Sequence, residues 1–324
     1  MPDGFLLNSI IMATGGEKYL DKPIIIIGSG RSGTTIMSEI IFQHEDLAWH
    51  SNWQEIIVFT PLINLLRPLM NNKFWRFKRF YKYVGVSKNT RQKHQSKIDL
   101  VLFNPIERYN FWEHITGKRI DFSRGFLMNE KATPDEVKRI RSFLNKQVKY
   151  QGKKRLIMKF TGPARLEYLT SIFPDAVIVN VIREPVATVR SWLEVGFWQR
   201  MGIDKLWWRG AYTQEEITYA ETIKDKPALI TALQYKKLME ATQQEINKLG
   251  LDVYECRYED FVKDPKTFIH KMMDFMQLPP SKNVDAYLEN MIVDNRNERQ
   301  SASKKSAMPE ETKQQILAIT GNYS

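Results

Sequence analysis

A glycine-rich stretch near the start of the chain has the residue types and spacing of an anion-binding loop. It follows four consecutive isoleucines and reads Gly28-Ser29-Gly30-Arg31-Ser32-Gly33-Thr34-Thr35. The glycines allow a sharp turn and a close approach of the backbone to a ligand. If a helix begins at the two threonines, its free N–H groups and its dipole attract an anion, and the side chains add donors. We therefore predict that residues 29–35 bind a phosphate-like group.

The same stretch differs from the loop of kinases and ATPases in the position of its cation. Those loops read G-x-x-x-x-G-K-[ST]. Here Gly28 and Gly33 have the required spacing, but Thr34 stands where the lysine would be, and the cation within the loop is Arg31. No matching acidic residue that would hold a metal is evident in the sequence. The pattern therefore argues against Mg-dependent phosphoryl transfer, and we expect no metal.

A second apolar strand is followed directly by another arginine. Arg183 comes immediately after the run Val177–Ile182, and open α/β sheets bind ligands at the carboxyl ends of their strands. A guanidinium group makes paired, charge-assisted hydrogen bonds to phosphate. Pro185 suits the first turn of a helix that would carry Ser191. Taken alone, the segment fits equally well an Arg183 that caps a helix or pairs with Glu184.

Taken together, the two motifs resemble those of the sulfotransferases that use 3′-phosphoadenosine 5′-phosphosulfate (PAPS). The form Arg31-Ser32-Gly33-Thr34-Thr35 looks like the family's 5′-phosphosulfate loop, and most like that of the tyrosylprotein and carbohydrate branches. Arg183 and Ser191 match the residues that hold the 3′-phosphate in the family. The resemblance implies transfer of a sulfuryl group from PAPS to a hydroxyl or amine of an acceptor, with PAP as the product. Arg31 would then stabilise the leaving group.

Further segments extend the resemblance over most of the chain. Met158-Lys159-Phe160 looks like the family's strand leading to the phosphate clamp, and Arg257–Pro265 is similar to a late R-Y-E-D-L-V-x-D-P element. In relatives a tyrosine near that element lies beside the nucleotide, which makes Tyr258 a candidate, although an ordinary core tyrosine fits as well. Arg296 and Lys304 fall where relatives place a basic loop over the nucleotide.

The general base that must take the acceptor's proton is not fixed by the sequence. In arginine-type relatives a glutamate follows the first helix, and ungapped counting from the loop puts Asn52 at that position. Glu55, one helical turn later, is the first candidate, and His50, whose imidazole titrates near neutrality, is the second. Glu107 and Glu113 are candidates for lining the acceptor pocket. A surface cap or a satisfied core histidine would explain Glu55 and His50 equally well.

The elements that must position these residues alternate between strands and helices. Apolar runs predict strands at 23–27, 156–158, 177–182 and 252–256, and helices to residue 43 and at 164–173, 185–192, 227–249 and 265–277. Such alternation predicts an α/β fold, with a parallel sheet flanked by helices as in P-loop NTPases. We predict a single domain, 1–324, in which 54–125 is a mainly helical insertion that shapes the acceptor site.

The composition suits a globular domain with an anionic ligand. Of the 324 residues 43% are apolar and 26% are charged, and the formal net charge is +11, which favours anionic partners. Basic and aromatic residues interleave in 73–97, but no nucleic-acid motif accompanies them. We therefore expect a small-molecule, lipid or saccharide acceptor and no nucleic acid. The chain has no apolar run of membrane-spanning length. We therefore expect no transmembrane segment, and any membrane contact would be peripheral.

Cys256 is the single cysteine of the chain. A disulfide within the chain is therefore excluded, and a soluble protein of the cytoplasm is the expected setting.

Two functional hypotheses remain open at this level. The first is a catalytic sulfotransferase with PAPS as co-substrate. The second is a module that binds PAPS or PAP without turnover, which the unassigned base keeps open.

Overall fold

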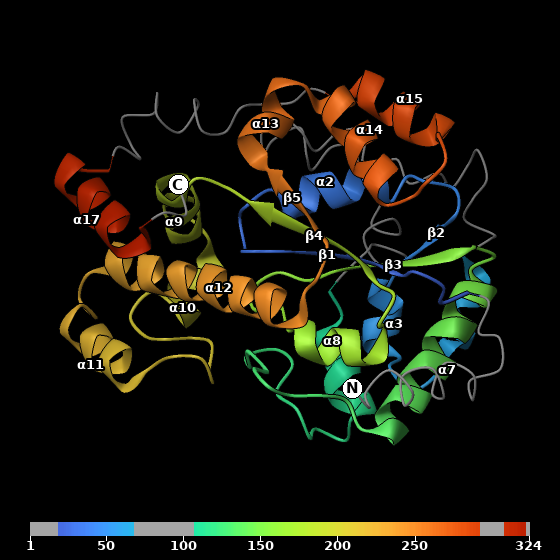
Figure 1. Ribbon diagram of the computed structural model, residues 1–324, viewed down its shortest axis with the longest axis horizontal. Coiled ribbons are helices and arrows are strands. Elements are labelled where there is room, and N and C mark those ends of the chain that lie inside the picture. The colour runs from blue at the N-terminus through green and yellow to red at the C-terminus, as the bar shows by residue number, and fades with distance from the viewer. Residues whose placement is uncertain (1–18, 68–106, 292–307, 322–324) are drawn as a thin grey trace.

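A computed structural model describes residues 19–67, 107–291 and 308–321 of the chain. These residues form a five-stranded sheet with the strand order β2-β3-β1-β4-β5, in which every neighbouring pair is parallel (Figure 1). The strands are β1 Ile24–Gly28, β2 Leu47–Ala48, β3 Arg155–Lys159, β4 Val177–Ile182 and β5 Val253–Arg257. The predicted parallel α/β fold is confirmed. The short edge strand β2 is an element that the sequence patterns did not indicate.

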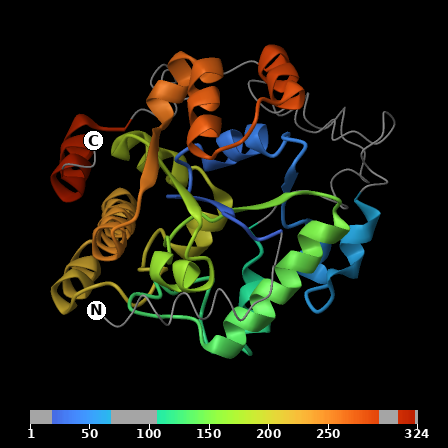
Figure 2. The same cartoon turned by 45° about the vertical axis from the view of Figure 1, so that its right-hand side comes forward.

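Helices cover both faces of the sheet (Figures 1 and 2). On one face lie α2, α13, α14 and α15; on the other lie α6, α7 and α8, while α9 to α12 and α17 gather beside the β4–β5 half. The helices are α2 Thr34–Ile41, α3 Asn52–Ile56, η1 Pro61–Leu66, α6 Tyr109–Ile115, α7 Pro134–Tyr150, α8 Leu166–Ile172, α9 Pro185–Leu193, α10 Gly196–Met201, α11 Gln214–Thr222, α12 Pro227–Leu249, α13 Tyr258–Lys263, α14 Pro265–Phe275, α15 Lys282–Asn290 and α17 Glu310–Thr320, where η1 is a 3-10 helix.

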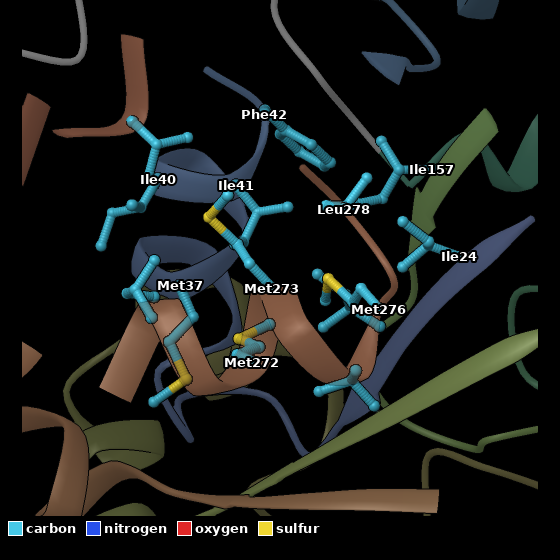
Figure 3. Packing of buried hydrophobic residues seen from close by; sticks show 14 of the residues in the cluster. Ile24, Met37, Ile40, Ile41, Phe42, Ile157, Met272, Met273, Met276 and Leu278 are labelled. Carbon is cyan, nitrogen blue, oxygen red and sulfur yellow. The ribbon is translucent and has the colours of Figure 1, made fainter. Parts of the chain in front are cut away.

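The four isoleucines before the glycine-rich loop are buried on both faces of the sheet. Ile24 and Ile26 belong to the cluster formed with α2 and α14, and Ile25 and Ile27 belong to the cluster on the opposite face. Figure 3 shows the first cluster, which combines Ile24 and Ile157 of the sheet with side chains from α2 and α14. All four are at most 1% exposed, and burying each stabilises the fold by about 2 kcal/mol. A central parallel strand therefore reads as a continuous apolar run.

The strand order places the functional motifs at one edge of the sheet. Because all the strands run in the same direction, their carboxyl ends lie together, and β1 has β3 on one side and β4 on the other. The chain builds one half of the sheet after β1 and the other half from β4 onward. The carboxyl ends of β1 and β4 therefore form the topological switch point at which α/β sheets bind ligands.

The predicted insertion 54–125 lies mostly outside the described residues. Its described ends contain the last part of α3, the 3-10 helix η1 and helix α6. The predictions for the insertion as a whole and for the basic-aromatic run 73–97 therefore stay predictions. Among the helices that the structure describes, none is both long and apolar enough to cross a bilayer.

Candidate active site

The loop after β1 leads directly into the start of a helix, as the sequence predicts. Helix α2 begins at Thr34, and its N-cap residue is Gly33, which has no side chain that could cap the helix. The first N–H groups of the helix therefore have no side-chain cap and can face a ligand. Thr35 is exposed at this helix start, whereas Thr34 is buried. Arg31 adopts a left-handed backbone conformation with φ 71°, which gives the loop its sharp turn.

Two glycines of the loop are required by the aromatic rings that lie against it. A Cβ atom at Gly30 would lie 2.6 Å from the indole nitrogen of Trp192, and one at Gly33 would lie 2.5 Å from Cδ2 of Tyr258. Gly33 also has φ 100°, a conformation that residues with a Cβ atom rarely adopt. The loop is therefore enclosed by a ring from α9 and a ring from the start of α13.

The two predicted phosphate motifs contact each other. Nε of Arg31 donates a hydrogen bond to Oγ of Ser191 over 3.0 Å. Nη1 of Arg183 donates to the carbonyl oxygen of Arg31 over 2.9 Å. Residues about 150 positions apart in the sequence thus form one cationic cluster at the switch point. Arg183 and Ser191 are almost fully buried in it.

Arg183 is itself held by aromatic side chains. Its guanidinium carbon lies 4.6 Å from the centroid of the Tyr258 ring, and the hydroxyl of Tyr235 donates to its carbonyl oxygen over 2.9 Å. The carboxylate of Glu184 caps α9 by accepting from the N–H groups of Val186 and Ala187. The residue that caps α9 is therefore Glu184 and not Arg183. Tyr258 lies beside the cluster, and its placement next to a nucleotide stays a prediction.

A lysine that the sequence reasoning did not assign also reaches this loop. Lys159 ends β3, next to β1, and its Nζ atom lies 3.5 Å from Oγ1 of Thr35. The same atom pairs with Oε1 of Glu107 over 2.8 Å. The signal that would have found it is its position, because it is a cation at the carboxyl end of a predicted strand beside the loop.

Glu107 is an anchor for Lys159 and for its own segment. Its carboxylate accepts hydrogen bonds from the hydroxyls of Tyr109 and Thr161 and from the N–H of Thr161, besides pairing with Lys159. Burial raises its pKa, but Lys159 and the hydrogen-bond donors outweigh burial and hold the pKa below its ordinary value. A carboxylate with so many donors is a poor proton acceptor.

His50 is buried in a polar network beneath α7. Its Nδ1 lies 3.2 Å from Nη1 of Arg108 and within 3.3 Å of the side-chain amide of Gln147. A guanidinium group can only donate, so Nδ1 accepts and the ring proton of the neutral imidazole belongs on Nε2. Burial, together with the charge of Arg108, lowers the pKa of His50 well below its ordinary value. His50 is therefore a neutral hydrogen-bond donor through Nε2, an atom that is buried with no partner among the described residues.

Glu55 keeps one carboxylate oxygen without a hydrogen bond. Oε1 accepts from the N–H of Asn110 over 3.2 Å, whereas Oε2 is buried and has no partner in the described part of the chain. Burial raises the pKa of Glu55, which the Asn110 N–H and the charge of Arg108 only partly offset. A partly buried carboxylate with a raised pKa and a free oxygen has the properties of a general base.

Glu113, like Glu55 and His50, has its hydrogen-bond partners outside the glycine-rich loop. Oε1 of Glu113 accepts from the N–H and the hydroxyl of Ser123, over 3.0 and 2.6 Å, so this carboxylate stabilises the turn after α6. Arg296 and Lys304 lie outside the described residues. Within the described ranges no group of three or more His, Cys, Asp and Glu side chains is placed to hold a metal ion. Cys256 is buried in β5, and burial raises its pKa.

Comparison with known proteins identifies the family. The sequence model of the sulfotransferase family matches residues 23–282, so this chain belongs to the sulfotransferase family. No curated protein sequence matches the chain.

Solved sulfotransferases share its fold. Sulfotransferase STF9 from Mycobacterium avium has a TM-score of 0.55 at 15% identity, over 96% of this chain and 79% of that one. Sulfotransferase STF1 from Mycobacterium tuberculosis H37Rv has a TM-score of 0.53 at 14% identity, over 96% and 81%. At such low identity the likeness shows the fold alone.

Proposed function

We propose that this chain transfers the sulfuryl group of PAPS to a hydroxyl or amine of a small-molecule, lipid or saccharide acceptor and releases PAP. The observation that carries the proposal is the contact between the two phosphate motifs. The side chain of Arg31 bonds to Ser191, and Arg183 bonds to the backbone of Arg31. The cluster therefore offers cationic donors both beside the loop proposed for the 5′-phosphosulfate and at the clamp proposed for the 3′-phosphate.

In this reaction the acceptor oxygen or nitrogen attacks the sulfur, and the bond from sulfur to the bridging oxygen of PAPS breaks. Negative charge grows on the 5′-phosphate of PAP as the bond breaks. Arg31, the amides at the start of α2 and the Thr34 and Thr35 hydroxyls would stabilise that charge. Lys159, 3.5 Å from Thr35, supplies a further cation at the same helix start.

The acceptor's proton must leave with a base, and Glu55 is the carboxylate we assign to that role. Its Oε2 has no hydrogen-bond partner within the described ranges and its pKa is raised by burial, whereas Glu107 is fully engaged with its donors. His50 would instead donate a hydrogen bond from Nε2 to an oxygen of the sulfuryl acceptor, because Arg108 requires its Nδ1 to accept.

We also propose the cytoplasm as the location, in keeping with a single cysteine that is buried.

Calorimetric titration with PAP, AMP, ATP plus Mg²⁺ and a DNA duplex tests the ligand. We expect PAP to bind, and AMP, ATP and DNA to bind much more weakly or not at all. Arg183→Met should weaken PAP binding about 10- to 100-fold, since charge-assisted hydrogen bonds are lost. The matched control is Arg139→Met on the exposed surface of α7, which should bind PAP as the parent does. Equal affinities for PAP and AMP, or no effect of Arg183→Met, would contradict the proposal.

The alternative is a module that binds PAPS or PAP without turnover. Transfer of radiolabelled sulfate from PAPS to a panel of sugars, lipids and phenols separates the two functions. Labelled product supports the enzyme, whereas PAP binding without product from any acceptor supports the module.

A further inference from the structure

A cavity of about 380 Å³ lies beside the helices that follow the second phosphate motif. It is lined by α11, the first turn of α12 and the segment 204–212 that precedes α11, and it is open to solvent on one side. Figures 1 and 2 both show α11 alongside α12. Its interior is apolar and aromatic, and the side chains that form it are Leu206, Trp208, Tyr212, Ile217, Ala220 and Ile230. The size and lining suit a small organic ligand.

The wall of this cavity is held rigidly by buried hydrogen bonds. Gln234, which is fully buried, accepts from the N–H of Trp207 over 2.7 Å and donates to the carbonyl oxygens of Gly202 and Lys205. On the other side of the segment, the N–H of Arg209 donates to the carbonyl oxygen of Arg124 over 2.9 Å. The cavity is therefore preformed, so a ligand would not have to order this segment.

One polar group inside the cavity lacks a partner. Tyr212 lines the cavity, and its hydroxyl oxygen is buried without a hydrogen bond in the part of the chain that the structure describes. Burial, together with the Glu216 carboxylate, raises the pKa of Tyr212, so the phenol stays neutral and can donate. A buried hydroxyl without a partner is unfavourable, and a ligand oxygen would relieve it.

One cation at the rim of the cavity has no ion-pair partner among the described residues. The rim carboxylates of Asp204 and Glu221 each have a lysine within 4.0 Å, namely Lys205 and Lys224. Arg209, by contrast, is exposed and has neither an ion pair nor a side-chain hydrogen bond among the described residues.

A second guanidinium group adds to the positive charge beside Arg209. Burial and the neighbouring charge of Arg209 together lower the pKa of Arg124. Arg124 does not line the cavity, but its Nε donates to the carbonyl oxygen of Trp207, two residues before Arg209. The like charges of the two guanidinium groups favour an anionic group near Arg209.

We propose that this cavity binds a small amphipathic anion, with an apolar or aromatic body against Trp208 and one carboxylate, sulfate or phosphate group at Arg209. The inference concerns binding alone and does not depend on the proposed transfer reaction.

The cavity is connected to the loop of the candidate active site through two neighbouring tryptophan rings, which are tilted by 44° relative to each other. The Trp208 ring lies 5.5 Å from the ring of Trp192, which lies against Gly30. Trp208 also lies over Gly162, whose N–H donates to the carbonyl oxygen of Gly28. A ligand in the cavity therefore sits against side chains that support the loop, although it is separated from the loop by two indole rings.

Calorimetry with 2-naphthoate and its neutral analogue 2-naphthamide tests the proposal on the full chain. We expect naphthoate to bind with a submillimolar Kd and naphthamide about tenfold more weakly, as for the loss of one charge-assisted contact. Arg209→Gln should weaken naphthoate binding about tenfold and leave naphthamide unchanged. Arg139→Gln, an exposed arginine on α7, should behave as the parent protein does.

Two further variants locate the probe. Ala220→Phe fills the cavity and should abolish binding of both probes. If it does not fold, Ile217→Asp, at a position that is 41% exposed, should weaken both. Arg183→Met should leave naphthoate binding unchanged, which separates this site from the one proposed for PAP. Failure of naphthoate to bind the parent protein, unchanged binding in Arg209→Gln, or loss in Arg183→Met would overturn the inference.

Discussion

At the scale of single residues, hydrogen-bond partners decide the roles of chemically similar side chains. Glu55, Glu107 and Glu113 are all partly buried glutamates, the first near the end of the described segment 19–67 and the other two at the start of the segment 107–291. Glu107 has four donors around it and Glu113 has two on one oxygen. Glu55 accepts through Oε1 from the N–H of Asn110, and its Oε2 has no partner among the described residues. This difference in partners, rather than in residue type, is the reason why we propose Glu55 as the base.

The first prediction concerns this carboxylate. Glu55→Gln should lower kcat for sulfuryl transfer by about 100-fold or more, the usual contribution of a general base, and leave PAP affinity unchanged. Because only the ionised carboxylate accepts a proton, turnover of the parent should rise with pH through the raised pKa of Glu55, and this rise should vanish in the variant. Glu311→Gln, exposed on α17, is the control. Parent-like turnover in Glu55→Gln would exclude Glu55 as the base.

At the scale of elements, the loop after β1 depends on a ring from the first residue of α13, directly after β5. Gly33 has both a positive φ and the Tyr258 ring against its α-carbon. Gly250, the C-cap of α12, has φ 61° but nothing within 4 Å of the Cβ position. A substitution at Gly250 therefore tests backbone strain alone, whereas one at Gly33 tests strain together with the steric clash against Tyr258.

The second prediction uses this pair. Gly250→Ala should reduce the free energy of unfolding by about 1 kcal/mol, the cost of a left-handed alanine. Gly33→Ala should reduce it by more, since the methyl group must also displace Tyr258, and it should abolish stabilisation by PAP in a thermal shift assay. Urea unfolding of both variants measures the difference. Equal losses of stability, with PAP binding retained, would mean that the ring readily moves away.

At the scale of the whole molecule, a buried acid joins two helices that are distant in the sequence. Glu245 on α12 is 2% exposed, and its Oε1 accepts from the N–H of Glu167 at the start of α8 over 2.9 Å. Burial raises the pKa of Glu245 to about 7, although the N–H groups of Glu167 and Leu166 partly offset it. The folded state therefore retains a proton at pH values where the unfolded chain has lost it.

The third prediction follows from that proton. The ordinary pKa of glutamate is 4.5, and that of Glu245 in the folded state is about 7. Between these pH values the folded state binds more protons than the unfolded state, so the free energy of unfolding falls as the pH rises. The loss amounts to at most about 3 kcal/mol. Glu245→Gln should remove this decline when urea unfolding is measured from pH 5 to pH 8. Glu311→Gln should keep it. Parallel pH profiles for the parent and Glu245→Gln would show that Glu245 ionises normally.

The strand–loop–helix segments were predictable because their signals are local. The run Ile24–Ile27 and the glycines after it specify a buried strand and a tight turn within a dozen residues, and Val177–Ile182 with Pro185 does the same. Parallel pairing then has to place both arginines at one edge. The convergence of Arg31 and Arg183 could therefore be predicted without knowing any side-chain contact.

What the sequence by itself determined is the family, the parallel fold and the two phosphate motifs, since each is written in a short, contiguous pattern. Only the tertiary structure decided the side-chain roles. Lys159 reaches the loop because β3 pairs with β1, and His50 becomes a donor because Arg108 lies against its Nδ1. The cavity beside Trp208 likewise forms from residues of separate elements. These contacts join side chains that are far apart in the chain. The protonation state of each side chain, and the hydrogen bonds it can still make, depend on partners that no local pattern specifies.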